Sequence, residues 1–367
     1  MDAPLRGLKV IEAANFLAGP MSGMMLADLG ADVIKVEPPR GDPYRRFGRP
    51  YGDAGLVFKA ANQNKQSVAL DLKSEQGMAS LRELLADADV LITNWRPGVA
   101  ERMGLTAEQV RADFPQLIWV RVSGYGPDGP RAALPAFDGI VQARSGAMIS
   151  GVDAPTNVNN NVADKVSAMF AAQTVTAALH QRSKTGTGVV CDMPMVDAMA
   201  YFYGADIAAG HRIADQPADA AVAAAAAGDA TFITADGWLT LSPVTGKQLR
   251  RAMEAAGVGD QFSDVMDADR SRTFEVFADA LGPALLDRAA DEWEHIFVEA
   301  DVPASAIRTF DQHLADDQTI HNQTYQPVED PSVDGSWLLV RYPAFFDGKR
   351  VETAGLPAPE LDEHGSS

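Results

Sequence analysis

Short runs rich in β-branched and apolar residues alternate, from Leu8 to Val122, with segments whose apolar residues recur every three or four positions. The expected strands are Leu8–Glu12, Asp32–Glu37, Ser67–Leu72, Asp89–Thr93 and Leu117–Val122. The expected helices between them are Pro20–Leu29, Ser74–Ala86 and the segment around Thr106–Ala112. Because parallel neighbours in a sheet need crossover connections, this alternation predicts an α/β fold with a doubly wound parallel sheet.

The middle of the chain predicts an irregular segment followed by further helices and a strand of the same α/β fold. Ser123–Asn161 is rich in Gly, Pro and Asn and is expected to lack regular structure. It is followed by an expected long helix, Val162–Lys184, then a strand, Val189–Met193, and a helix, Met195–Ala209.

A second, smaller α+β domain is expected after the Ala-rich segment Ala214–Gly228, which we interpret as a linker helix. Thr231–Ser242 predicts a hairpin that turns at Asp236-Gly237, and helical patterns follow between Lys247 and Ala300. One further strand is expected at Trp337–Tyr342, and the polar end from Asp362 onward is expected to fray.

Charge and cysteine usage narrow the class of protein. The 367 residues carry a net charge of -19 with no basic run, so the field of the whole molecule would repel nucleic acid, and an anionic ligand requires a local basic cluster. The lone cysteine, Cys191, allows no internal disulfide and is interpreted as a small core residue. With no export signal or apolar membrane-spanning run at the sequence level, we expect a cytoplasmic protein with no membrane partner.

Common catalytic patterns are missing from the sequence. The turn after the first strand lacks G-x-G-x-x-G, so Glu37 at the end of the second strand is interpreted as a solvated or capping acid rather than a ribose ligand. The six histidines are scattered, which disfavours a metal site, and no G-x-S-x-G motif supplies a serine nucleophile. The sequence therefore leaves carboxylate side chains as the candidate catalytic groups.

A series of motifs in a fixed order resembles the class III CoA-transferases, the CaiB/BaiF group, which includes formyl-CoA transferase-like enzymes and α-methylacyl-CoA racemases. The motifs are Leu8–Glu12, Phe16–Pro20, Leu26–Pro38, Asn62–Lys73, Asn94–Gly98, Arg102–Leu105, Ser123–Gly126, Phe137–Gly139 with Gln142-Ala143 and Ser145-Gly146, Val162–Lys165, Ala178-Leu179 with Arg182, Thr185-Gly186 with Gly188, Met195–Ala198, and, more weakly, Asp301–Pro303 and Ala358–His364.

The resemblance implies a domain layout and an assembly. It predicts a large Rossmann-like CoA-binding domain over residues 1–205, a linker over 206–228, a small α+β domain over 229–315, and a linker with a C-terminal return to the large domain over 316–367. Each chain would form a ring, and two rings would interlock in a homodimer.

The resemblance also implies that Asp164 is the nucleophile. It would attack an acyl-CoA thioester and pass CoA to a free carboxylic acid through an aspartyl mixed anhydride and an aspartyl-CoA thioester, without a metal. From its position alone, Asp164 is interpreted as a helix N-cap, and the helix N-terminus is expected to keep it ionised. Asp138 matches an acidic position next to the active site.

Eight positions match the family's CoA contacts. They are Leu17, Ala18, Leu70, Lys73, Asn94, Arg96, Arg102 and Met103. Three of them are cations suited to phosphates, and the apolar members suit adenine and pantetheine. Arg40, Arg45 and Arg46 are further phosphate candidates, but Pro38 stands where several family members have an arginine.

Two alternatives stay open at the level of sequence. The first is an α-methylacyl-CoA racemase, but Phe137 stands where racemases of the family have a histidine, and a phenyl ring carries no proton. The second is a CoA-binding protein without turnover or a nucleotide-linked dehydrogenase. The donor and acceptor acids cannot be deduced from the sequence.

Overall fold

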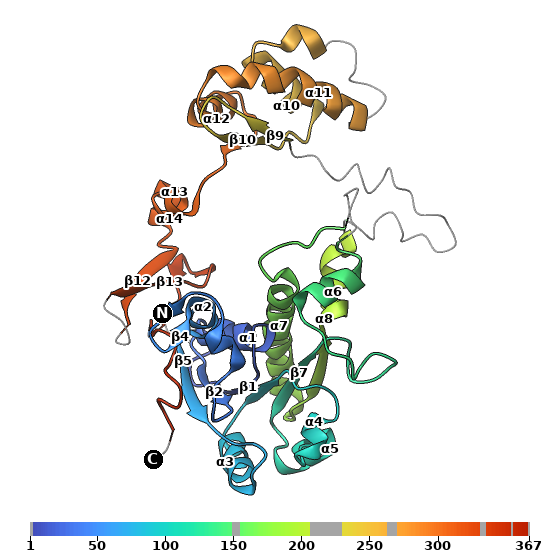
Figure 1. Ribbon diagram of the computed structural model, residues 1–367, viewed down its shortest axis with the longest axis vertical. Coiled ribbons are helices and arrows are strands. Elements are labelled where there is room, and N and C mark those ends of the chain that lie inside the picture. Colours follow the sequence, from blue (N-terminus) through green and yellow to red (C-terminus); the bar gives the residue numbers. More distant parts are fainter. Residues whose placement is uncertain are drawn as a thin grey trace. The chain divides into compact units, whose positions relative to one another are not determined.

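A six-stranded parallel sheet forms the centre of the larger unit of the molecule (Figure 1). Its strands are β1 (Lys9–Ala13), β2 (Asp32–Glu37), β5 (Lys65–Ala69), β6 (Val90–Thr93), β7 (Ile118–Ser123) and β8 (Val190–Pro194). They lie in the order β5-β2-β1-β6-β7-β8, and every neighbouring pair is parallel. The prediction of an α/β fold around a parallel sheet is confirmed.

The structure is a computed structural model that describes residues 3–148, 155–205, 230–262, 270–330, 335–353 and 355–365. The chain divides into two units. Unit 1 comprises Met1–Ile149, Ala154–Tyr203 and Gln318–Ser367, and unit 2 comprises Ser150–Asp153 and Gly204–Asp317. The predicted linker, with its Ala-rich segment Ala214–Gly228, lies outside the described residues.

Helices cover both faces of the sheet because its strands are apolar on both sides. On one face, Val10 packs in a cluster with α1 (Ala18–Ala27), α6 (Asp138–Ser145), α7 (Val162–Thr185) and α8 (Met195–Phe202). The next residue, Ile11, points the other way and packs with α3 (Glu75–Ala86), α4 (Val99–Arg102) and α5 (Ala107–Asp113). The alternation of side chains along a strand thus builds a three-layered, doubly wound unit.

Three predicted elements differ from the structure. The helix α6 lies inside the segment predicted to be irregular. It is only eight residues long and ends at Gly146, which has φ 83°, so its apolar pattern is too short to predict a helix. The strand β5 begins at Lys65 rather than Ser67, and α8 ends at Phe202. A further helix, α2 (Leu56–Asn62), was not predicted.

Unit 2 has its own core. The strands β9 (Ala230–Ile233), β10 (Trp238–Leu241) and β11 (Ala304–Ala306) form an antiparallel sheet in the order β11-β10-β9, and β9 and β10 confirm the predicted hairpin. The helices α10 (Gly246–Ala255), α11 (Arg270–Ala284) and α12 (Ala290–Glu299) follow. Phe297 and Trp293, whose rings stack with centroids 5.5 Å apart, belong to the buried cluster that joins helices and sheet.

The remaining elements of the chain are short. They are the 3-10 helices η1 (Pro43–Arg46), η2 (Tyr203–Ala205), η4 (Gly259–Phe262) and η5 (Leu285–Asp287), the helices α13 (Phe310–Leu314) and α14 (Asp317–His321), and the strands β3 (Pro50–Tyr51), β4 (Ala54–Gly55), β12 (Tyr325–Glu329), β13 (Ser336–Val340), β14 (Phe345–Phe346) and β15 (Lys349–Arg350). None of the helices in the described part of the chain has the length and apolar character that crossing a membrane requires.

Fully buried charges lie under the first helix of unit 1. The Nζ of Lys35 lies 3.0 Å from Oε1 of Glu12, and the Nζ of Lys65 lies 2.7 Å from Oε2 of the same carboxylate. Lys35 also donates to the carbonyl oxygen of Ala14, and Lys65 to that of Pro20. Because a buried charge is tolerable only when it is paired, these contacts fix β1, β2, β5 and the start of α1 relative to one another.

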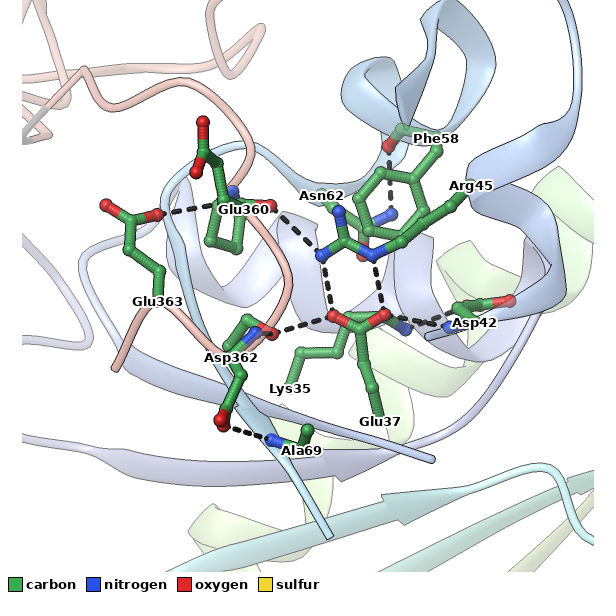
Figure 2. Close-up of polar contacts among 12 residues, drawn as sticks. Lys35, Glu37, Asp42, Arg45, Phe58, Asn62, Ala69, Glu360, Asp362 and Glu363 are labelled. Carbon is green, nitrogen blue, oxygen red and sulfur yellow. Dashed lines mark hydrogen bonds and ion pairs between the residues drawn. The ribbon is translucent and has the colours of Figure 1, made fainter. Parts of the chain in front are cut away.

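A second buried pair holds the C-terminal segment against the sheet (Figure 2). Arg45 donates two hydrogen bonds, of 2.8 and 2.7 Å, to the carboxylate of Glu37, and a third to the carbonyl oxygen of Pro359. The backbone N–H of Ala69 in β5 donates to Oδ1 of Asp362 at 2.7 Å. The residues from 359 to 364 are therefore fastened along β5, and the expectation of a frayed end from Asp362 is wrong for the residues described there.

The same pair corrects two interpretations from the sequence. Glu37 is neither a solvated acid nor a helix cap, because it is buried and bound to Arg45. Arg45 is not available for a phosphate, since its guanidinium also contacts Asp53 and lies 4.1 Å from the centre of the Phe58 ring. The lone cysteine, Cys191, lies in β8 and is only partly buried.

We predict that replacing Arg45 with Met destabilises unit 1 strongly, because it leaves the buried charge of Glu37 without its partner. Breaking a buried pair costs about 3–5 kcal/mol, and about 2–4 °C is lost per kcal/mol in a unit of this size, so the melting temperature should fall by roughly 6–20 °C. Arg46→Met is the matched control, because Arg46 is the next residue and is exposed. Differential scanning calorimetry measures both, and equal effects of the two substitutions would contradict the role given to Arg45.

Candidate active site

A cavity of about 490 Å³ opens at the carboxyl end of the sheet, between β1 and β6. The crossovers run in opposite directions from these two strands, and this switch point is where open α/β sheets bind ligands. The cavity is lined by the turn after β1, the turn after β6, the end of β7 and the first turn of α7. These segments contribute, among others, the lining residues Phe16, Leu17, Arg96, Ser123 and Asp164.

Two asparagines hold the turns after β1 and β6 together. The backbone N–H of Asn15 donates to Oδ1 of Asn94 at 2.9 Å, and Nδ2 of Asn94 donates to the carbonyl oxygen of Asn15 at 2.6 Å. Gly19 lets α1 approach the end of β1 closely, because a Cβ at that position would lie 2.4 Å from the Cβ of Ala14. Asn94, predicted to contact CoA, therefore has its side-chain amide committed to positioning the cavity wall.

Asp164 lies in the first turn of α7 and lines the cavity. The N-cap of α7 is Asn161 and not Asp164, so the sequence-based assignment of Asp164 as the cap is wrong. The cap interaction comes instead from another helix: Oδ1 of Asp138 accepts hydrogen bonds from the backbone N–H groups of Ala163, at 2.7 Å, and Asp164, at 3.2 Å. Asp138 thus satisfies two of the unpaired donors at the start of α7.

Gln142 connects Asp138 to the segment before α7. Its Nε2 donates to Oδ2 of Asp138 at 2.6 Å and to the carbonyl oxygen of Val158 at 2.9 Å, while its Oε1 accepts from the N–H of Val158. Gln142 is completely buried. Residues four apart on α6 therefore fix both the approach to α7 and its first turn.

The pKa of Asp164 is raised from 3.8 to about 7, first by burial of the carboxyl group and then by the nearby negative charge of Asp138. This differs from the expectation that the helix N-terminus keeps Asp164 ionised. Near neutral pH, the group exists in comparable amounts of carboxylate and carboxylic acid. A carboxyl group with its pKa near neutrality, facing a cavity, is typical of a functional site.

The structure brings together six of the ten residues predicted for the site. Leu17, Ala18, Asn94, Arg96, Arg102 and Asp164 line the cavity. Asp138 lies behind it and acts through the start of α7. Leu70, Lys73 and Met103 do not line this cavity, and Lys73 is exposed on the turn after β5.

Several cavity residues were missed by sequence reasoning. Asn15, Phe16, Trp95 and Ser123 all line the cavity and all follow, or end, parallel strands. The signal that could have found them is their position at the carboxyl ends of β1, β6 and β7, where loops of an α/β sheet converge on the ligand. Among the described residues, no group of His, Cys, Asp and Glu side chains is arranged to hold a metal ion.

Comparison with known proteins gives consistent matches along the whole chain. The family model for CoA-transferase family III matches residues 5–365. The cinnamoyl-CoA:phenyllactate CoA-transferase of Clostridium sporogenes is 31% identical over 385 residues, which covers 98% of this chain and 90% of that protein. The succinyl-CoA–D-citramalate CoA-transferase of Chloroflexus aurantiacus is 33% identical over 343 residues, which covers 90% of this chain and 85% of that protein.

A solved structure has the same fold. The crystal structure of a CaiB/BaiF family protein from Brucella suis matches with a TM-score of 0.85 and 28% identity, covering 99% of this chain and 98% of that one.

The raised pKa of Asp164 predicts how stability depends on pH in an Asp164→Asn variant. Above about pH 4 the unfolded chain has lost this proton, whereas the folded chain keeps it until about pH 7, so the folded state of the native protein loses stability over this range. The asparagine variant has no such loss. Its gain in melting temperature over the native protein should therefore grow from pH 5 to pH 7 and level off above, as measured by thermal unfolding in matched buffers.

Asp197→Asn is the matched control, because Asp197 lies in the first turn of the neighbouring helix α8 but is exposed. A gain for Asp164→Asn that is the same at pH 5 and pH 8 would contradict the assignment of a raised pKa.

Proposed function

This chain belongs to CoA-transferase family III, and we propose that it moves CoA from an acyl-CoA thioester to a free carboxylic acid with Asp164 as the covalent nucleophile. CoA thioesters are the substrates that membership of the family implies. The observation that carries the proposal is the chemistry of the cavity wall. Among the described residues that line the cavity, Asp164 is the only carboxylate, and Arg96 and Arg102 are the only cations.

The two arginines suit the phosphates of CoA. Both are exposed, and neither forms an ion pair in the described part of the chain, so both are available to a ligand. On a protein with a net charge of -19, they supply the local cationic cluster that an anionic ligand needs. Leu17 and Ala18 add apolar surface for pantetheine. Leu70, Lys73 and Met103 lie outside the cavity and belong to the proposal as contacts for the distal part of a long ligand.

The reaction begins with attack by the carboxylate oxygen of Asp164 on the thioester carbonyl carbon. The C–S bond breaks, CoA leaves as a thiolate, and an aspartyl mixed anhydride remains. The thiolate then attacks the aspartyl carbonyl carbon, which releases the first acid as a carboxylate and leaves an aspartyl-CoA thioester. The carboxylate of the second acid attacks the carbonyl carbon of this thioester, the C–S bond breaks, and CoA leaves again as a thiolate while a new mixed anhydride forms. The thiolate then attacks the acyl carbon of this anhydride, which gives the new acyl-CoA and restores the carboxylate of Asp164.

Each step exchanges an activated acyl group for another, so the protein mainly has to orient the groups and exclude water. Only the ionised form of Asp164 is a nucleophile. The pKa of about 7 keeps a large fraction of that form at neutral pH and makes the carboxylate more basic than an exposed aspartate. Asp138 is a positioning residue in this scheme, since it holds the first turn of α7.

The racemase alternative needs a second acid or base across the α-carbon, and no histidine lines the cavity among the residues described there. The residue that precedes Asp138 is Phe137, whose ring cannot carry a proton. An interlocked homodimer is part of the proposal, on the strength of the family resemblance, and sedimentation of a folded monomer at low micromolar concentration would contradict it.

We predict that Asp164→Ala lowers kcat for CoA exchange by more than about 1000-fold, because it removes the atom that accepts the acyl group. Acyl-CoA binding, measured by isothermal titration, should be almost unchanged. With acyl-CoA and hydroxylamine present, the native protein should yield a peptide modified at Asp164. Asp197→Ala, in the first turn of α8, should keep its activity. Retention of more than about a tenth of kcat by Asp164→Ala would exclude covalent catalysis by this residue.

We also predict that Arg102→Ala raises KM about tenfold, and by a similar factor for every acyl-CoA, because a phosphate contact is common to all donors. The control is Arg111→Ala, on the exposed face of α5. Steady-state kinetics with three acyl-CoA donors measure the effect. If KM changes for one donor only, Arg102 lines the acyl subsite instead.

A further inference from the structure

Four aromatic side chains meet beside Asp164. The ring of Phe16 lies edge-on to three others, with centroids 5.1 Å from Phe137, 6.3 Å from Tyr44 and 6.2 Å from Phe47. Phe16 and Phe137 line the same cavity as Asp164. Burial raises the pKa of Tyr44, and the charges of Asp164 and Asp42 raise it further.

The central ring of the cluster is held in an unfavourable backbone conformation. Phe16 has φ 65°, in the left-handed region that residues other than glycine rarely adopt. Its N–H donates to Oδ1 of Asp42 at 3.1 Å, and the N–H of Tyr44 donates to the same oxygen at 2.9 Å. Asp42 is itself buried against Lys35. The buried charges therefore fix the aromatic surface before any ligand arrives.

Two members of the cluster keep much of their apolar surface exposed. Phe137 is 55% exposed and Phe47 is 50% exposed. Covering aromatic surface in a cavity with an apolar group makes the free energy of binding more favourable, and ring edges favour contact with a second ring. Phe16 and Phe137, the two members that line the cavity, thus offer contact to the part of a ligand that lies next to Asp164.

Two basic residues near this surface are already paired. Lys35 is bound to Glu12 and Asp42, and Arg45 is bound to Glu37 and Asp53. Arg96 and Arg102 reach the cavity from the turn after β6 and from α4, whereas the aromatic residues come from the turns after β1 and β2 and from the start of α6. A second carboxylate placed against Phe16 and Phe137 would lose water and gain no counter-charge from these two rings.

We propose that Phe16 and Phe137 form the surface against which the acyl group lies, so that the enzyme selects acyl-CoA thioesters with an uncharged aromatic or branched apolar acyl group and rejects short dicarboxylic acyl groups. This inference rests on the proposed function, because it takes Asp164 as the residue that receives the acyl group. It adds the substrate class, which membership of the family leaves open.

The test is an identity exchange, in which only the acyl group differs between assays. The enzyme is incubated with 3-phenylpropionyl-CoA and ring-deuterated 3-phenylpropionate, or with succinyl-CoA and deuterated succinate, and mass spectrometry follows the label into the thioester. Each exchange has an equilibrium constant near one, so the rates report recognition. We expect kcat/KM to be at least about 30-fold higher for the phenylpropionyl pair, the order of the loss when a polar group is buried unpaired.

Variants of Phe137 assign the selectivity to the aromatic surface. Phe137→Ala should lower kcat/KM for phenylpropionyl exchange about tenfold and leave succinyl exchange nearly unchanged, whereas Phe137→Leu should retain most of the activity. Phe137→Arg should raise the succinyl rate relative to the phenylpropionyl rate, because it supplies the missing counter-charge. Phe345→Ala is the matched control, since Phe345 is also about half exposed, at 48%, but lies in β14, away from the cavity lining.

Two results would overturn the inference while leaving the proposed function intact. One is exchange of succinyl-CoA by the native enzyme as fast as that of 3-phenylpropionyl-CoA. The other is an equal loss in both exchanges for Phe137→Ala. If the native enzyme exchanges label with neither pair, nor with other acyl-CoA donors, the proposed function itself fails and this inference fails with it.

Discussion

The buried carboxylate of Glu12 is the interaction on which the rest of unit 1 depends. It binds two lysines, Lys35 from β2 and Lys65 from β5, and all three charged side chains are buried. Removing charges from water is costly, and only close pairing offsets the cost. An arrangement that shifts β1, β2 or β5 would leave at least one charge unpaired, so the network selects a single register for this half of the sheet.

The same network extends to the cavity. Lys35 also contacts Asp42, and Asp42 holds the backbone of Phe16 in its left-handed conformation. On the other side, the pair of Glu37 and Arg45 fastens the C-terminal segment along β5. The charges therefore have two effects: they close unit 1 with residues more than 300 positions away in sequence, and they fix the aromatic wall beside the candidate nucleophile. Buried polar networks whose members are all paired favour a single arrangement of the core.

Asp164 illustrates how two carboxylates can share a site in different roles. Asp138 receives hydrogen bonds from two backbone N–H groups and from Gln142, whereas Asp164 faces the cavity beside apolar rings. Burial and the charge of Asp138 raise the pKa of Asp164. Neighbouring acids whose environments differ in this way are suited to separate tasks, with one orienting the helix and the other reacting.

The sequence by itself determined the strands and most helices around the parallel sheet, because the alternation of apolar residues is a local property that burial on both faces enforces. It also pointed to Asp164, Arg96 and Arg102, through motifs that the structure brings to one cavity. It could not show that Arg45 is bound in a buried ion pair with Glu37, or that the carboxylate of Asp138, rather than that of Asp164, accepts the hydrogen bonds at the start of α7. Those facts depend on contacts between elements far apart in the chain, where pairing and desolvation decide which charges remain free to act, and only the tertiary structure sets them.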